Sequence, residues 1–367
     1  MKQVDISKFK QDTSFYGSLN IVLTVKSFDL QAIRKRYIKS RGDKTGKTGS
    51  VERRAVSLGG IVSMSIDGGK IQDEKVLAKL KEPRGLALSE NHVGISSENE
   101  AYVIAENGEV RLINDPWFSY IHTLDFSKDG SKILISSSGF DVIMEFDVAT
   151  LEKTYEWWAW ENGFNQGYSS ALAKNVTISR DESNRGKDGF HIVSNPEQDA
   201  LPTAMRAAFI NSVVYDTKRE GKLLATFFHE GKVMEIDRAT GLATSVVVGL
   251  KNPHGGDRFD DSYTGTSTGT GFVAVTGKDE VTHYDFSNLG GKPEFLEGME
   301  WLQNSKNIDG NIITIDSNRN QFVIFNPELE LIDAIAYNDN WAVQDMIMGS
   351  LTAQQEKQII VLDNPTN

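Results

Sequence analysis

The chain of 367 residues has a formal charge of −12, no cysteine and 39% hydrophobic residues. The absence of cysteine excludes disulfides, thiolate metal sites and cysteine nucleophiles. The net negative charge argues against sequence-independent binding to the phosphate backbone of nucleic acid. No apolar run approaches the ~18 to 20 residues of a membrane span, and the first residues lack the apolar core of a secretory signal. We therefore expect a cytoplasmic protein that binds neither nucleic acid nor membrane.

The apolar residues fall in short runs of four to seven, which is typical of an all-β chain. In chain order, the first strong strand is expected at Leu19–Asp29. A basic stretch at about residues 34–54 follows, and its interruption by Gly and Thr favours a flexible, solvated loop. The run Gln358–Asp363 near the C-terminus is expected to be a strand.

Six segments between these ends share one pattern, in which a large hydrogen-bonding residue precedes a strand-like run. The segments are PRGLAL (83–88), IHTLDFS (121–127), INSVVYD (210–216), PHGGDRF (253–259), QNSKNI (303–308) and VQDMIM (343–348). The aligned polar residues are Arg84, His122, Asn211, His254, Asn304 and Gln344, with steps of 38, 89, 43, 50 and 40 residues. One four-stranded propeller blade takes ~40 to 50 residues, so the pattern predicts a six-bladed β-propeller.

The step of 89 residues indicates an insertion at about residues 157–208. The insertion begins with the aromatic run WWAWENGF (157–164), which suits either a lid or local core. Because it lacks the repeated start motif, we favour an elaborated loop over a hidden seventh blade. The terminal strands Leu19–Asp29 and Gln358–Asp363 are expected to pair and close the ring, which leaves no open sheet edge. Residues 1–367 are then a single propeller domain.

The segments SGFDVIMEFDVAT, HEGKVMEIDRATG and KNPHG resemble a broad superfamily of six-bladed propellers. This superfamily includes NHL-repeat, SMP-30/gluconolactonase-like, strictosidine-synthase-like and arylsulfotransferase-like proteins, and the resemblance covers roughly residues 81–348. It implies that the innermost strand of each blade begins at the mouth of a central channel, where ligands, metals and catalytic groups commonly lie. The six aligned residues would then surround one mouth. One fold hosts many functions, so the resemblance specifies architecture rather than chemistry.

A ring of polar residues must be hydrogen-bonded, because an unsatisfied buried polar group costs ~1 to 3 kcal/mol. Either water and backbone groups satisfy the ring, or a metal or polar ligand does. His122 and His254 suit Zn, Fe, Cu or Ni, and the amide oxygen of Asn211 between them suits Ca. The two histidines equally suit general acid and base roles near neutral pH. Their arrangement resembles that of arylsulfotransferase-like and lyase-type propellers, which implies that a histidine transfers a group or binds the metal. No carboxylate occupies the ring, which departs from SMP-30-like enzymes, where an acidic ligand is expected.

Arg84 suits a carboxylate, sulfate or phosphate on a substrate, or else an ion pair with a loop acid. Aromatic residues recur two or three positions before several aligned residues, where they would either floor a pocket or pack between loops. Arg206 approaches the same end from the insertion. The predicted catalytic residues are thus His122, His254 and Arg84, and the predicted substrate-binding residues are Arg206, Tyr120, Trp301, Trp341, Asn304 and Gln344.

These residues favour an enzyme that acts on a small polar or aromatic molecule by lyase, hydrolase or group-transfer chemistry. A divalent metal ion held by His122, His254 and Asn211 would be its cofactor. The alternative is a non-catalytic propeller that binds a protein, peptide or metabolite on its top face. The enzyme is favoured because the distinctive residues converge inside the channel, whereas a docking propeller would concentrate its anchors on exposed loops.

Overall fold

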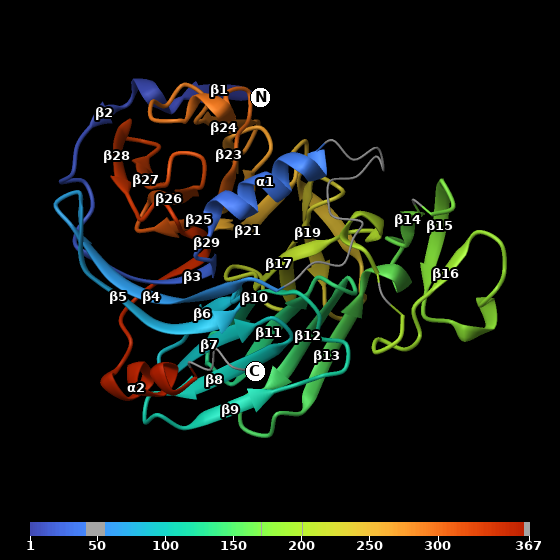
Figure 1. Ribbon diagram of the computed structural model, residues 1–367. Helices are drawn as coiled ribbons and strands as arrows, with labels where there is room; N and C mark the ends of the chain where they lie inside the picture. Colours follow the sequence, from blue (N-terminus) through green and yellow to red (C-terminus); the bar gives the residue numbers. More distant parts are fainter. Residues whose placement is uncertain (42–55, 170, 200, 363–367) are drawn as a thin grey trace.

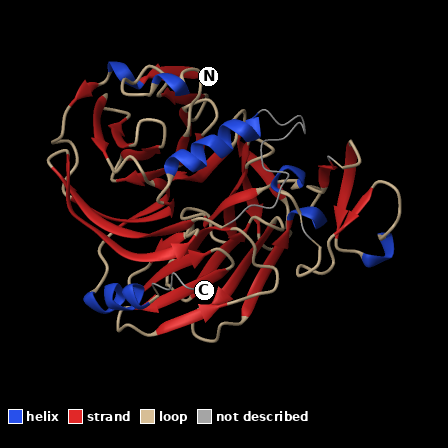
Figure 2. Cartoon of the chain, in the orientation of Figure 1, coloured by secondary structure: helices blue, strands red, loops and turns tan. Residues whose placement is uncertain are grey.

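The structure is a computed structural model that describes residues 1–41, 56–169, 171–199 and 201–362. Strands dominate this part of the chain and form seven separate sheets (Figures 1 and 2). Six of these sheets have four or five strands, and the seventh has three. Short 3-10 helices lie at η1 (Ile6–Lys8), η2 (Ala159–Glu161), η3 (Glu182–Asn184), η4 (Thr203–Met205) and η5 (Glu294–Leu296).

Three of the sheets each consist of four strands that follow one another in the chain and pair antiparallel. The first contains β6 (Leu86–Leu88), β7 (His92–Ser97), β8 (Glu100–Ala105) and β9 (Val110–Ile113). The second contains β10 (Ile121–Phe126), β11 (Lys132–Ser137), β12 (Val142–Asp147) and β13 (Lys153–Trp158). The third contains β17 (Ile210–Tyr215), β18 (Lys222–Phe227), β19 (Lys232–Asp237) and β20 (Ala243–Val247).

Two further sheets gain a fifth, parallel strand from the N-terminus. One contains β21 (Pro253–Phe259), β22 (Ser262–Ser267), β23 (Phe272–Thr276), β24 (Val281–Asp285) and the added β1 (Lys2–Asp5). The other contains β25 (Leu302–Ile308), β26 (Asn311–Asp316), β27 (Gln321–Asn326), β28 (Leu331–Ala336) and the added β2 (Lys10–Gln11). Ile6 and Phe9, between the added strands, are buried, so the N-terminal segment ties two outer edges together.

The sixth large sheet joins the two ends of the chain. Its order is β29 (Ala342–Met348), β3 (Leu19–Ser27), β4 (Leu58–Asp67) and β5 (Lys70–Lys81), with antiparallel pairing throughout. The strand predicted at Leu19–Asp29 is therefore present as β3. It pairs with β29 rather than with the C-terminal run Gln358–Asp363.

The prediction of a strand at Gln358–Asp363 is wrong, because most of this run belongs to helix α2 (Ala353–Val361). The Thr352 side chain accepts from the Gln355 backbone, and the Gln355 side chain accepts from Thr352. This capping box fixes a helix start and outweighs the strand propensity of the short apolar run. The helix packs against β5 and β8 (Figure 1).

Helix α1 (Leu30–Arg41) occupies the beginning of the stretch predicted as a loop at about residues 34–54, so the prediction is wrong there. The rest of that stretch, from residue 42, lies outside the described residues. Arg34 is buried and donates to the carbonyl oxygens of Ser317 and Asn318 at 2.8 and 3.0 Å, which fixes α1 on the turn after β26. No described helix has the length and apolar character that a membrane crossing requires.

The first strands of the six large sheets form a ring of contacts. They are β6, β10, β17, β21, β25 and β29, each of which contacts the next, and β29 contacts β6. Small antiparallel sheets arranged in this way are the architecture of a β-propeller, as the sequence predicts. In the five strands from β10 to β29, the hydrogen-bond ladder is irregular beside the aligned polar residue. Such bulges re-aim side chains where a strand begins.

The insertion lies between Trp158, at the end of β13, and Ile210, at the start of β17. It contains the seventh sheet, with strands β14 (Gln166–Ser169), β15 (Lys174–Ser179) and β16 (Phe190–Ile192), which lies apart from the others in Figure 1. The β15–β16 pair is parallel, unlike any pair within a four-strand repeat. Trp157, Trp158 and Trp160 are buried in the core shared by β10–β13 and β17–β19, so the aromatic run is local core rather than a lid.

Candidate functional site

The six aligned residues lie at one end of the ring, where the first strands begin; we call this end the mouth. Arg84 precedes β6, and the other five lie within β10, β17, β21, β25 and β29. His254 is half-buried, and the rest are buried. Four residues that stand two positions before an aligned residue share φ angles of 40° to 59°: Glu82, Tyr120, Phe209 and Asn252. This repeated left-handed backbone supports the alignment.

Arg84 links three side chains at the mouth. Its Nη2 donates to Glu82 Oε2 at 2.9 Å, and its Nη1 lies 3.4 Å from His122 Nε2 and 3.5 Å from Gln344 Oε1. Arg84 and Glu82 are only 6% and 4% exposed. The ion pair with a loop acid, one of the two alternatives for Arg84, is therefore present, and the guanidinium also reaches two aligned residues.

Two more cations reach the same side of the mouth. The Arg206 guanidinium lies 4.8 Å from the centre of the Tyr120 ring, and the Arg84 guanidinium lies 4.4 Å from the same ring. Lys26, in β3, donates from Nζ to Gln344 Oε1 at 3.0 Å. We call Lys26, Glu82, Arg84, His122, Arg206 and Gln344 the mouth cluster. Lys26, Arg84 and Arg206 are the cations of this cluster and Glu82 is its carboxylate; the buried carboxylate of Asp141, outside the cluster, also interacts electrostatically with Arg206.

His122 is neutral, and its contacts define its tautomer. Nδ1 lies 3.1 Å from the Tyr120 carbonyl oxygen, which only accepts, so Nδ1 carries the proton. The lone pair on Nε2 then accepts from Arg84. Burial lowers the pKa of His122 well below its ordinary value, and the positive charges of Arg84, Arg206 and Lys26 lower it further.

His254 has the same tautomer but a different second nitrogen. Its Nδ1 lies 3.3 Å from the Asn252 carbonyl oxygen and 2.9 Å from Thr268 Oγ1, which places the proton on Nδ1. No hydrogen bond within the described residues involves Nε2, which keeps its lone pair. Burial lowers the pKa of His254 to about 3, and the charge of Lys26 contributes. His254 therefore presents an unprotonated nitrogen at neutral pH.

The mouth amides mainly brace the protein itself. Asn304 donates to Asp345 Oδ1 at 2.7 Å and accepts from the Ser305 backbone at 2.8 Å. Asn211 donates to the Pro253 carbonyl oxygen at 2.8 Å, while its Oδ1 is buried without a partner among the described residues. The amides thus connect neighbouring first strands, and Asn211 keeps one acceptor for a water molecule or ligand.

Aromatic rings separate the two histidines. Ring centres lie 5.5 Å apart for His122 and Phe209, 4.8 Å for Phe209 and Phe228, and 5.6 Å for Phe228 and His254. Together with Tyr120, these rings form an apolar wall beside the cations.

The two predicted tryptophans pack away from this wall. Trp301 stacks on Tyr37 of α1, with ring centres 4.8 Å apart, and Trp341 packs edge-on against Phe28 at 6.3 Å. Both are 5% exposed. A substrate-binding role for these two residues stays a prediction, and their contacts are those of packing between loops.

The sequence pattern does not identify Lys26, Glu82, Phe228 or His229 as part of the site. Lys26 lies on the second strand of its sheet, and Phe228 and His229 lie on the turn between β18 and β19, so none occupies the aligned position. His229 Nδ1 donates to the Arg206 carbonyl oxygen at 2.8 Å. Glu82 could have been found, because it precedes Arg84 by the same two residues that separate Tyr120 from His122.

The mouth is a poor match for the predicted metal ion. The described residues contain no group of three or more His, Asp or Glu side chains arranged to hold one. His122 Nε2 faces the Arg84 guanidinium, and a cation between the histidines would meet the repulsion of Arg84, Arg206 and Lys26. A metal at His122, His254 and Asn211 stays a prediction, and we derive no step through it.

Farther along the first strands, a second charged layer faces the channel. We call it the throat, and its residues are Asp125, Asp257, Lys306 and Asp345 of β10, β21, β25 and β29. Burial opposes the charge on Lys306, but the carboxylates of Asp345, Asp257 and Asp125 raise its pKa. Because β10 and β25 are opposite members of the ring, these charges interact across it. Burial raises the pKa of Asp125 to about 7.

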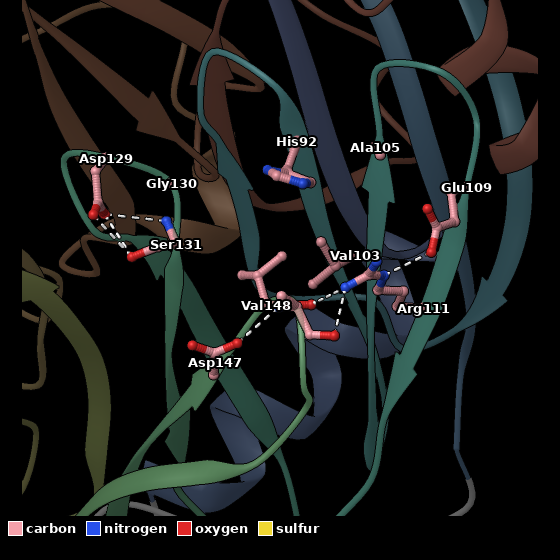
Figure 3. A pocket seen from close by; sticks show the side chains of 11 residues that line it. His92, Val103, Ala105, Glu109, Arg111, Asp129, Gly130, Ser131, Asp147 and Val148 are labelled. Atoms are coloured by element: carbon pink, nitrogen blue, oxygen red, sulfur yellow. Dashed lines mark hydrogen bonds and ion pairs between the residues drawn. The ribbon is translucent and has the colours of Figure 1, made fainter.

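A separate pocket of about 280 Å³ lies among the turns at the far end of the ring (Figure 3). The charged side chains Arg111 and Asp147 are used by those turns, while His92 Nδ1 is buried without a hydrogen-bond partner among the described residues. Arg111 donates to the Val148 and Ala149 carbonyl oxygens at 2.6 and 2.8 Å, and Asp147 accepts from the Ala149 and Thr150 backbones at 2.9 Å. Asp237 binds its own turn in the same way, so this arrangement belongs to the repeat rather than to a ligand site.

The chain matches no protein-family model and no curated protein. Among solved structures, it is similar to a chain of a nidogen/laminin complex, with 12% identity and a TM-score of 0.54, covering 91% of this chain and 100% of that one. It is also similar to a protein of unknown function from Bacteroides caccae, with 11% identity and a TM-score of 0.51, covering 90% and 98%. Virginiamycin B lyase from Staphylococcus aureus aligns at 12% identity with a TM-score of only 0.41, covering 70% and 84%. The first two similarities support the propeller fold and say nothing of activity.

Proposed function

We propose that the chain is a closed six-bladed propeller whose mouth binds a small anionic molecule and acts on it by lyase, hydrolase or group-transfer chemistry. The six large sheets are the blades in this proposal, and the pairing of β29 with β3 closes the ring. The cyclic contacts of the first strands support this count. The three-stranded sheet of the insertion is an elaboration on the mouth side.

The composition of the mouth cluster carries the proposal of an anionic ligand. Arg84, Arg206 and Lys26 come from three separate parts of the chain and converge on one side, where Glu82 is the acid of the cluster. Guanidinium groups bind carboxylate, sulfate and phosphate through paired N–H donors. The wall of Tyr120, Phe209 and Phe228 favours a ligand with a flat apolar part.

His254 is the proposed proton acceptor. The Nδ1 contacts leave its Nε2 with a lone pair that is unprotonated at pH 7. Because the low pKa makes this nitrogen a weak base in the free protein, the proposal requires that the negative charge of the bound anion raise that pKa. Nε2 takes a proton from the substrate in an elimination, or from a water molecule that attacks the substrate in a hydrolysis. In the elimination, the electron pair of the broken C–H bond forms the new double bond, and the departing group leaves with the electron pair of its own bond. In the hydrolysis, an electron pair of the water oxygen forms the new bond to the substrate, and the leaving group departs with the electron pair of the bond that breaks. His122 holds Arg84 instead, because its Nε2 faces that side chain.

The test uses a panel of aryl carboxylates, aryl sulfates and aryl phosphates, with turnover measured by chromatography and affinity by calorimetry. His254→Gln should lower turnover of the accepted compound by about 10² to 10⁴ and leave its affinity within a few-fold. Arg206→Gln should instead weaken affinity by about tenfold or more, because a charge-assisted contact is lost.

The matched control for the base is His283→Gln, which replaces an imidazole stacked on Phe272 in an outer strand. This variant should keep wild-type turnover. Equal turnover by His254→Gln and the wild-type protein would refute the assignment of the base. Tight binding of the panel without any turnover would support the non-catalytic alternative.

A further inference from the structure

Asp141 stands at a turn that recurs in four of the sheets, between the second and third strands. The equivalent residues are Asp141, Gly231, Gly271 and Asn320, with φ angles of 53°, 66°, 74° and 52°. In each case the carbonyl oxygen accepts from the backbone at the end of the fourth strand; the donors are Ala159, Leu250, Phe286 and Tyr337, respectively. The turn itself therefore needs only a residue that tolerates the left-handed conformation, such as Gly or Asn.

The carboxylate of Asp141 has a task that its counterparts lack. Its Oδ2 accepts from the Ala207 and Ala208 backbones at 2.9 and 3.1 Å, and its Oδ1 accepts from the Ile210 backbone at 3.3 Å. The Trp160 indole also donates to Oδ2 at 3.3 Å. Trp160 lies where the insertion leaves the blade, and the other three donors lie where it returns. One fully buried side chain thus fastens both ends of the insertion.

The length of the connection explains why, among these four turns, only the one with Asp141 carries an acid at the left-handed position. The link from β13 to β17 runs from Trp158 to Ile210, whereas the link from β20 to β21 runs only from Val247 to Pro253. A long excursion has more conformational freedom to lose, and its return must be fixed by specific contacts. A carboxylate offers two acceptor oxygens and no donor, which matches the four N–H groups around it.

Arg206 lies directly beside the segment 207–210 that Asp141 holds. This residue directly precedes Ala207, and its carbonyl oxygen accepts from His229 Nδ1 at 2.8 Å on the other side. The backbone of Arg206 is therefore held between Asp141 and His229, while its guanidinium stacks on Tyr120 and Phe209 at 4.8 and 4.9 Å. A small displacement of this backbone would take the guanidinium away from the mouth.

We propose that Asp141 is a positioning residue that holds Arg206 at the mouth, so that the insertion sets the specificity of the site for an anionic ligand. This inference rests on the proposed function. The insertion then supplies one cation of the mouth cluster, Arg206, whereas the other two cations come from a blade strand and from a link between blades.

The test is a double-mutant cycle between Asp141→Asn and Arg206→Gln, with inorganic sulfate as the probe and calorimetry as the readout. Asparagine already occupies the equivalent turn at Asn320, so Asp141→Asn preserves the backbone conformation and removes acceptor capacity. Each single variant should bind sulfate about tenfold more weakly than the wild-type protein, and the double variant should bind no more weakly than Arg206→Gln. Multiplicative losses in the double variant would overturn the inference.

The matched control is Asp147→Asn, which removes the same charge from a turn at the far end of the ring. This variant should bind sulfate within twofold of the wild-type value. If Asp141→Asn does not fold, His229→Gln replaces it in the cycle, because His229 holds the same backbone from the opposite side. The same lack of additivity with Arg206→Gln is then expected.

Hydrogen exchange separates this inference from the proposed function. The amides of Ala207, Ala208 and Ile210 should exchange at least tenfold faster in Asp141→Asn than in the wild-type protein, while amides of β18 and β19 stay unchanged. If the wild-type protein does not bind sulfate, the proposed function fails, and the exchange result still decides whether Asp141 holds the segment. Unchanged exchange at the three amides would overturn the positioning role.

Discussion

The mouth cluster and the throat differ in charge and are built from different parts of the sheets: the charged residues of the mouth cluster lie on β3, on the link before β6 and on the insertion, whereas those of the throat lie on the first strands. The mouth cluster holds Arg84, Arg206 and Lys26 with one acid, whereas the throat holds three aspartates with one lysine. An anion bound at the mouth, as we propose, would be repelled by the carboxylates of the throat. The comparison sets a layer rich in cations against a layer rich in carboxylates within one ring.

The two layers also differ in how burial acts on their titratable groups. At the mouth, burial lowers the pKa of His122 and His254, so the neutral imidazole is the stable form. In the throat, burial raises the pKa of Asp125, so the neutral carboxylic acid is favoured at a higher pH than usual. Acid should therefore affect the two layers with opposite signs.

The largest effect is expected from breaking the buried pair of Arg84 and Glu82. Arg84→Met leaves the Glu82 carboxylate buried without its cation, and we expect a loss of about 3 to 5 kcal/mol in the free energy of unfolding, measured with urea. The double variant Glu82→Gln, Arg84→Met should recover most of this loss, because no uncompensated charge remains. Equal losses in the single and double variants would show that the pair does not organise the mouth.

A smaller effect is expected from acid acting on the mouth. An unfolded histidine binds a proton below about pH 6.5, whereas His254 in the folded protein does so only near pH 3, so this residue makes stability fall as the pH falls between these values. His254→Gln should reduce that slope by up to about 1.4 kcal/mol per pH unit, measured by urea unfolding from pH 7 to 4. An unchanged slope would mean that His254 titrates normally.

The smallest effect is expected in the throat, with the opposite sign. Folded Asp125 binds a proton below about pH 7 and the unfolded residue only below about 3.8, so its ionisation destabilises the protein above this range. Asp125→Asn should raise the melting temperature at pH 8 by about 1 to 3 °C, and this gain should disappear at pH 4. The amide oxygen can still accept from the Tyr215 backbone. A lower melting temperature at pH 8 would contradict the contrast between the layers.

The propeller fold and the aligned mouth residues could be predicted because both repeat along the chain. Arg84, His122, Asn211 and His254 stand at the same point of successive sheets, and a ring brings such points to one end. The bulges beside them also explain why the throat was not predicted. Asp125 and Asp257 follow their aligned residues by three positions, but Asp345 follows Gln344 by one, so no single offset identifies the layer.

Contacts from outside the repeat could not be predicted from the pattern. Lys26 reaches Gln344 from β3, more than 300 residues earlier in the chain, and no local signal connects the two. Helix α2 differs, because the sequence contains its capping residues Thr352 and Gln355, whereas the short apolar run after them, taken alone, favours a strand. The role of Asp141 could not be predicted either, because it depends on buried contacts to Ala207 and Ala208, which lie far from Asp141 in the sequence.

The central claim is that the mouth attracts an anion, and locating one directly tests it. Crystals soaked in low-millimolar sodium selenate would reveal the selenium by anomalous scattering. The account predicts a peak within hydrogen-bond reach of the Arg84 and Arg206 guanidinium groups in the wild-type protein and no such peak in Arg206→Gln. Selenate bound elsewhere with the mouth vacant, or a manganese ion bound between His122 and His254 in a parallel soak, would contradict it.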